Sequence, residues 1–143
     1  MDATVNRKAV RQAIAAGLSS NMPTAQVVYR YQKSDFDQQS PVVRVFSAGS
    51  ERPTITARGS RSKFHVNVEL WVLYDNGGGW TEEKAEDAID TLEQELTAWV
   101  SSNQVTSLWT SLHFGQQSVL GNIIVGGVPY LVEEIALIAE VYG

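Results

Sequence analysis

The chain of 143 residues contains no cysteine, only four prolines and two histidines. The absence of cysteine excludes disulfide scaffolds, thiol catalysis and cysteine-based zinc sites. Long hydrophobic runs are also missing: the longest, such as Ile135 to Ala139, span a handful of residues, whereas a membrane helix needs about 20. No continuous apolar segment of a signal peptide follows the basic residues near the N-terminus. We therefore expect a protein that folds in the cytoplasm and has no membrane partner.

Recognisable catalytic and cofactor motifs are lacking as well. His65 and His113 have neither the HExxH nor the HxH spacing of metal sites, and no nucleophile motif accompanies them. The run Gly77–Gly79 lacks the GxGxxG and GxxxxGK[ST] spacings that hold phosphates, and acids follow it directly, so it indicates a turn. We expect no enzyme activity, no cofactor and no metal.

Positive charge is scarce in the second part of the chain. The formal net charge is -5, but the first 63 residues hold ten basic and four acidic residues, a balance of +6. From Phe64 onward, Lys84 is the only basic residue among 12 acidic ones, a balance of −11. Such asymmetry favours electrostatic choice of partners, although charges scattered over a solvated surface would also produce it.

The length suits a single domain, 1–143, with a core that needs neither disulfides nor metal. Helical spacing predicts an N-terminal helix over Ala3–Ser19 and an amphipathic helix of about five turns after an N-cap at Thr81. Strand patterns, with a Gly126-Gly127 turn between the last two, cover Ala25–Tyr31, Pro41–Phe46, Phe64–Asp75, Ser118–Val125 and Val128–Tyr142. Ser34–Pro41 and Ser101–Ser107 are expected to be polar connections.

The fold class predicted from these elements is α+β. A mixed, mainly antiparallel sheet is packed by the N-terminal helix and the central amphipathic helix, and a long β-hairpin arm or loop, Ser47–Lys63, is exposed. The strand Phe64–Asp75 alternates clearly, so one face belongs to the core. Trp71 and Leu73 on the other face indicate that its far end is covered too, by a helix or a neighbouring subunit.

Two charged surfaces are the candidate contact sites. The arm carries Arg52, Arg58, Arg61 and Lys63, and the outer face of the central helix carries Glu83, Glu86, Asp87 and Asp90. Trp80, beside the glycine turn, is the aromatic residue best placed for a contact outside the core. The arm could bind phosphates, but it has no interleaved aromatics and the protein is acidic, so sequence-specific nucleic-acid binding is not expected.

The order of these elements, together with Phe64–Val72 (FHVNVELWV) and Gly127–Ile135 (GVPYLVEEI), resembles the tail terminator (tail completion) proteins of long-tailed bacteriophages. The resemblance implies a structural virion protein of the tail or neck, assembled in the host cytoplasm. It implies a hexameric ring that caps the tail tube protein, stops tube polymerisation and joins the tail to the head connector or a neck protein, with DNA able to pass through.

A ring needs two unlike surfaces on each subunit, and the basic arm and the acidic helix supply them. Two alternatives stay open. One is another neck or head–tail connector protein, which would also form a ring. The other is a small α+β ligand-binding domain or enzyme whose site no motif marks.

Overall fold

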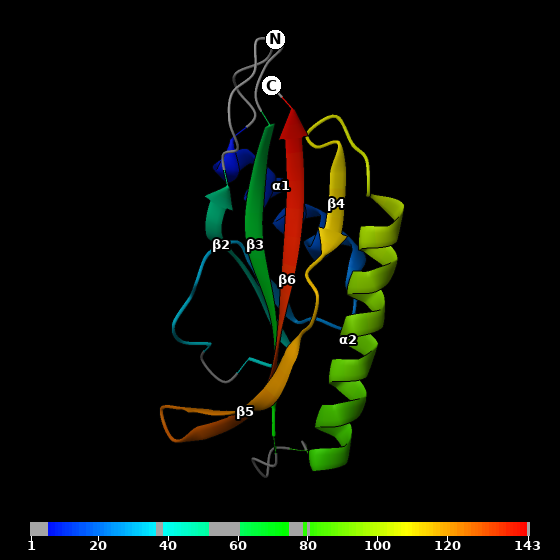
Figure 1. The fold of residues 1–143 in the computed structure, drawn as a ribbon. Helices are drawn as coiled ribbons and strands as arrows, with labels where there is room; N and C mark the ends of the chain where they lie inside the picture. Colours follow the sequence, from blue (N-terminus) through cyan, green and yellow to red (C-terminus); the bar gives the residue numbers. More distant parts are fainter. Residues whose placement is uncertain (1–5, 37–38, 52–60, 75–78, 80, 143) are drawn as a thin grey trace.

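The computed structural model describes residues 6–36, 39–51, 61–74, 79 and 81–142. Two helices and six strands follow one another along the chain: α1 (Arg7–Asn21), β1 (Val27–Tyr29), β2 (Val42–Glu51), β3 (Arg61–Leu73), α2 (Glu82–Ser102), β4 (Ser111–Phe114), β5 (Val119–Val125) and β6 (Val128–Tyr142). The strands form one sheet in the order β1-β2-β3-β6-β4, with β5 also paired to β6 (Figure 1). Among the described strand pairs, β1–β2 is parallel and the other four are antiparallel. The predicted α+β class, with both helices packed on a mostly antiparallel sheet, is confirmed.

Both helices begin with the side-chain caps that their sequences offer. The Asn6 side chain accepts a hydrogen bond from the Ala9 amide at 2.9 Å, and Thr81 Oγ1 accepts one from the Lys84 amide at 3.2 Å. Helix α1 runs to Asn21, two residues beyond the predicted end at Ser19. Helix α2 runs to Ser102, so the polar connection predicted from Ser101 begins later than expected.

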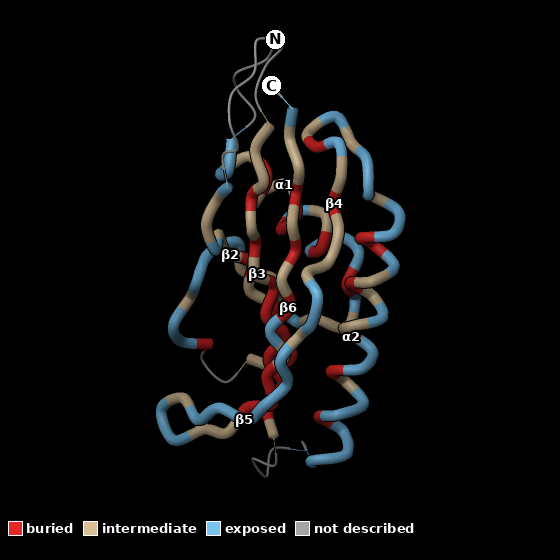
Figure 2. The backbone as a smooth tube through the Cα atoms, in the orientation of Figure 1, coloured by how far each residue is buried: buried red, intermediate tan, exposed pale blue. Residues whose placement is uncertain are grey.

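The two helices cover the same face of the sheet, and the main core lies between them and that face. Alternate residues of β3 point into this core, namely Phe64, Val66, Val68, Leu70 and Val72, as the alternation predicted. From α1 and α2 the core receives Val10, Ile14, Leu18, Ile89, Leu92 and Leu96, among others. Figure 2 shows these buried positions in red along the central strands and on the inner sides of the helices.

A second, smaller core lies on the opposite face, which we call the open face. Phe36, in the connection between β1 and β2, packs edge-on against Trp71, with ring centroids 4.9 Å apart, and against Tyr130 at 5.8 Å. The expectation that a helix or a neighbouring subunit covers Trp71 and Leu73 is therefore wrong, because a loop of the same chain covers them. Sequence periodicity did not find Phe36, since a lone aromatic residue in a polar loop has no period.

The predicted arm Ser47–Lys63 is partly a continuation of the sheet. β2 extends to Glu51 and β3 begins at Arg61, and the two strands stay paired up to Glu51 opposite Lys63. Their register shifts between Ser47 and Gly49, where Gly49 has a φ of 125° that suits glycine. Residues 52–60, which include Arg52 and Arg58, lie outside the described residues.

The strands at the two sides of the sheet differ from expectation in length. β1 has three residues rather than the seven predicted over Ala25–Tyr31, and β4 was not predicted at all. β4 has four residues and pairs with the C-terminal half of β6, with Leu112 buried in the main core. The predicted hairpin of β5 and β6 is confirmed, with φ of 58° and 79° at Gly126 and Gly127.

Candidate functional site: an exposed apolar hairpin and two charged surfaces

Of the predicted charged residues that the structure describes, the basic pair Arg61 and Lys63 and the four acids lie on opposite sides of the sheet. Arg61 and Lys63 belong to β3 and share the open face with His65, whereas α2 covers the other face. The four acids predicted on the outer side of α2, namely Glu83, Glu86, Asp87 and Asp90, are all exposed. Among the described residues, Arg61 and Lys63 are therefore not brought together with these acids within one subunit. Trp80 lies outside the described residues.

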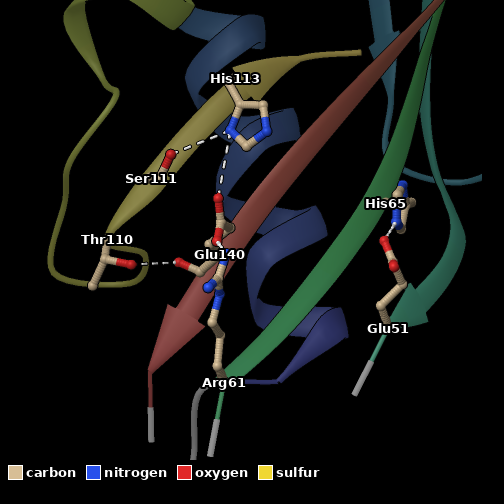
Figure 3. Close-up of polar contacts among 7 residues, drawn as sticks. All are labelled: Glu51, Arg61, His65, Thr110, Ser111, His113 and Glu140. Carbon is tan, nitrogen blue, oxygen red and sulfur yellow. Dashed lines mark hydrogen bonds and ion pairs between the residues drawn. The ribbon is translucent and has the colours of Figure 1, made fainter. Parts of the chain in front are cut away.

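Arg61 already has a partner in its own chain. Its guanidinium forms an ion pair with Glu140 of β6 and lies 5.6 Å from the centre of the Tyr142 ring. Glu140 is also near β4, because its Oε2 lies 4.0 Å from His113 Nδ1 and its backbone carbonyl accepts a hydrogen bond from Thr110 Oγ1 at 3.0 Å (Figure 3). Glu140 thus joins β3, β6 and the start of β4.

The group around His113 does not have the geometry of a catalytic relay. Ser111 Oγ lies 3.2 Å from His113 Nδ1, the same nitrogen that Glu140 approaches (Figure 3). A serine–histidine–acid relay needs the hydroxyl on one ring nitrogen and the carboxylate on the other, so that the ring can pass a proton between them. We interpret this group as a structural contact between strands.

The second histidine makes an equally simple contact. His65 Nε2 lies 2.6 Å from Glu51 Oε2, across the pair formed by β2 and β3 (Figure 3). This hydrogen bond is the main cause that lowers the pKa of the exposed Glu51 carboxyl. In the described part of the chain, no group of three or more histidine, aspartate or glutamate side chains is placed to hold a metal ion.

A buried ion pair supports the open-face core. Arg44 forms an ion pair with Glu69 and donates a hydrogen bond to the Lys33 carbonyl at 2.8 Å. Its guanidinium also lies over the rings of Phe46 and Trp71, at 5.3 and 5.0 Å. Both charged side chains are almost fully buried, and the pair anchors the connection between β1 and β2 to the sheet.

The feature that sequence reasoning missed is the surface of the β5–β6 hairpin. Figure 1 shows the hairpin leaving the body of the sheet at the end opposite the last residues of β6, and Figure 2 shows it largely exposed. Its large apolar side chains are solvent-accessible: Val119 is 67% exposed, Leu120 54%, Ile123 45% and Ile124 72%. Scattered apolar side chains are normal on a surface, but four on one edge strand, two on each of its faces, are typical of an interaction site.

β5 is also an edge strand. Within the described chain it pairs only with β6, so one row of its backbone amides and carbonyls has no strand partner. Natural proteins usually protect such an edge with charges, prolines or a covering element. β5 carries no charge, and no Asp, Glu, Lys or Arg occurs anywhere from Leu96 to Val132. That long charge-free stretch is the sequence signal that marks this surface.

Full burial of a valine, leucine or isoleucine side chain contributes about 1.5–3 kcal/mol. The four exposed fractions together correspond to rather more than two complete side chains. Covering the hairpin would therefore contribute on the order of 5 kcal/mol before the entropy of association is subtracted. A surface of this kind suits a subunit that is completed by a partner.

Two hollows offer alternatives for a small ligand. One, of about 180 Å³, lies beside the connection from β4 to β5 and contains the carboxylates of Glu93 and Glu133. Both carboxylates already accept hydrogen bonds from hydroxyl groups, Glu93 from Thr97 at 2.9 Å and Glu133 from Ser118 at 2.7 Å. The other, of about 300 Å³, lies between α1 and β1 and is lined mainly by small and aromatic side chains, together with Gln12 and Arg30. The carboxylates of the first hollow are thus already paired within the chain, and the second hollow has no carboxylate in its lining.

The chain matches no protein-family model, and no curated protein matches its sequence. Among the described residues, no helix is both long and apolar enough to cross a bilayer.

Proposed function

We propose that this chain is a structural virion protein, a tail terminator that assembles into a ring on the tail tube, stops tube polymerisation and joins the tail to the head connector. The observation that carries the proposal is the uncovered apolar edge strand β5. An assembling subunit needs a surface that is stable only when a partner covers it, and β5 has both unpaired backbone groups and exposed apolar side chains.

The distribution of charge agrees with a ring of identical copies. Such a ring uses a heterologous interface, in which one surface of a subunit meets a different surface of the next. Lys63 on the open face and the acids on α2 face different directions, so neighbouring copies can present unlike charges to each other. The choice of a tail terminator among assembling subunits rests on the resemblance in Phe64–Val72, Gly127–Ile135 and the order of the elements.

The test begins with native mass spectrometry of the purified chain at micromolar concentration, where we expect a six-fold species. Tail tube protein is then polymerised with and without the chain, and the products are imaged by electron microscopy. We expect a ring at one end of each tube and shorter tubes when the chain is present. A chain that stays monomeric and leaves tube length unchanged would contradict the proposal. A ring that binds the connector but not the tube would identify a different neck protein.

A further inference from the structure

Among the described strands, β1 and β5 each have one edge without a strand partner, and these two edges lie on opposite sides of the sheet. β1 ends the sheet on one side, where it pairs only with β2 within the described residues. β5 belongs to the other side, beyond β3 and β6. A contact between the β5 edge of one copy and the β1 edge of another therefore joins two different surfaces, as a ring requires.

The β1 edge is accompanied by a hollow that suits an apolar strand. The hollow of about 300 Å³ is lined by Gln12, Ala15, Ala16 and Ser19 of α1 and by Val28, Tyr29, Arg30 and Tyr31. Three of the four α1 residues are small, Gln12 being the exception, and the lining contains no carboxylate. Tyr31 is 53% exposed and packs edge-on against Tyr29, with centroids 6.0 Å apart. This edge therefore offers apolar surface with one cation beside it.

β5 exposes apolar side chains on both of its faces. Ile123 lies opposite Tyr130 in the register with β6, and Tyr130 belongs to the open-face core. By strand alternation, Ile123 and Val119 face the open side, whereas Leu120 and Ile124 face the side that the helices cover. A partner must cover both faces to bury all four.

The β1 edge provides cover on both of these sides. Val28 packs against the main core beneath α1, whereas Tyr29 packs against the open-face core. A strand added beside β1 would thus meet the α1 side of the hollow with one face and its tyrosine side, formed by Tyr29 and Tyr31, with the other. The strand that fits is uncharged, apolar on both faces and has a free edge of its own, and β5 of this chain has all three properties.

We propose that β5 of one copy docks along the free edge of β1 in a second copy, so that the sheets of neighbouring subunits become continuous. Leu120 and Ile124 then enter the hollow beside Ala16, and Ile123 packs on Tyr31. Backbone hydrogen bonds between the two edges give affinity, and the side-chain pockets give register. The inference rests on the proposed ring, and it names the two surfaces that meet within that ring.

Cross-linking tests the pairing directly because the chain has no cysteine of its own. Ile124→Cys and Ala16→Cys each place one thiol at an exposed position on one side of the proposed contact. We expect disulfide-linked dimers when the two single variants are mixed and oxidised, and a ladder of multimers from the double variant. The matched control pairs Ile124→Cys with Val105→Cys, a residue that is 74% exposed and outside the contact, and should give no product.

A second measurement follows assembly without cross-links. Replacing both Leu120 and Ile124 by serine should raise the subunit concentration at half assembly by about tenfold or more, whereas Val105→Ser should leave it unchanged. Circular dichroism and thermal melting of each variant establish that the fold is retained.

The outcomes separate the inference from the proposed function. Dimers from Ile124→Cys alone would mean that two β5 strands pair with each other, which overturns the inference. A six-fold species without cross-links in the mixture would overturn the inference and leave the ring intact. A cross-linked chain of copies that caps no tube would support the inference and contradict the tail terminator function.

Discussion

Gly17 lies where α1 meets α2, and its lack of a side chain leaves room for the indole ring of Trp99. A Cβ atom at Gly17 would lie 2.3 Å from Cζ2, 2.5 Å from Cε2 and 2.7 Å from Nε1 of Trp99. The indole is rigid and buried, and it packs edge-on against Trp109 with ring centroids 6.5 Å apart. Trp109 Nε1 in turn donates a hydrogen bond to the Asn103 carbonyl at 2.8 Å, so the two indole rings have little freedom to move aside.

Two effects of Gly17→Ala compete. In an open helix the change would stabilise the fold by about 1 kcal/mol, because alanine has a higher helix propensity and a less flexible unfolded state. Insertion of a methyl group into a packed core costs about 1–3 kcal/mol. A contact of 2.3 Å with a rigid ring belongs at the upper end of that range. We therefore expect a net loss of about 1–2 kcal/mol, or roughly 3–6 °C in Tm for a chain of this size.

Urea and thermal denaturation, followed by circular dichroism, measure this loss. The matched control is Ser20→Ala, on the exposed side of the same helix, which gains helix propensity without a new contact and should not be destabilised. A double-mutant cycle with Trp99→Phe should show coupling between positions 17 and 99. If Gly17→Ala were as stable as the parent or more stable, the close packing of α1 on α2 would be refuted.

Three further changes test other contacts. Arg44→Met leaves the buried Glu69 carboxylate without its cation and should cost about 3–5 kcal/mol in urea denaturation; a loss under 1 kcal/mol would contradict the buried pair. Burial raises the pKa of Tyr130, so the contribution of its neutral phenol to the free energy of unfolding is complete below its ordinary pKa and is lost as the pH rises above about 10. Tyr130→Phe should reduce this alkaline loss of stability, and an unchanged dependence of stability on pH would refute the prediction. His65→Ala should raise the pKa of the Glu51 carboxyl, measured by NMR titration, and an unchanged pKa would show that the hydrogen bond is absent in solution.

The elements that the sequence predicted well are those with local signals. The alternation from Phe64 onward marks β3, the Thr81 cap with its following helical spacing marks α2, and the Gly126-Gly127 pair marks the last hairpin. Each signal lies within the element that it describes. β4 had no such signal, because a strand of four residues is stabilised by its pairing with β6 and by Leu112 in the main core.

The candidate surfaces were harder to predict, because exposure depends on which strands lie beside each other. A strand with apolar residues on both faces is normally interior, and β5 resembles one in sequence. It is exposed because it lies at the edge of the sheet, beside the half of β6 that β4 does not pair with, and no further described strand pairs with it. Charge patterning could reveal the acidic side of α2 but could not reveal that Arg61 is paired with Glu140 of the same chain.

Ion pairs within the folded chain change the meaning of the charge asymmetry between the first 63 residues and the rest of the sequence. Arg44–Glu69 and Arg61–Glu140 each join a basic residue of the first 63 positions to an acidic residue of the remainder, within one subunit. The folded chain therefore neutralises part of its own asymmetry. The acids on α2 remain exposed, and faces of like charge repel one another when two copies approach helix to helix. The uncharged β5 edge has no such repulsion. In the proposed ring, the acids on α2 would therefore disfavour contact between helices, and the exposed apolar side chains of β5 would favour contact at its edge.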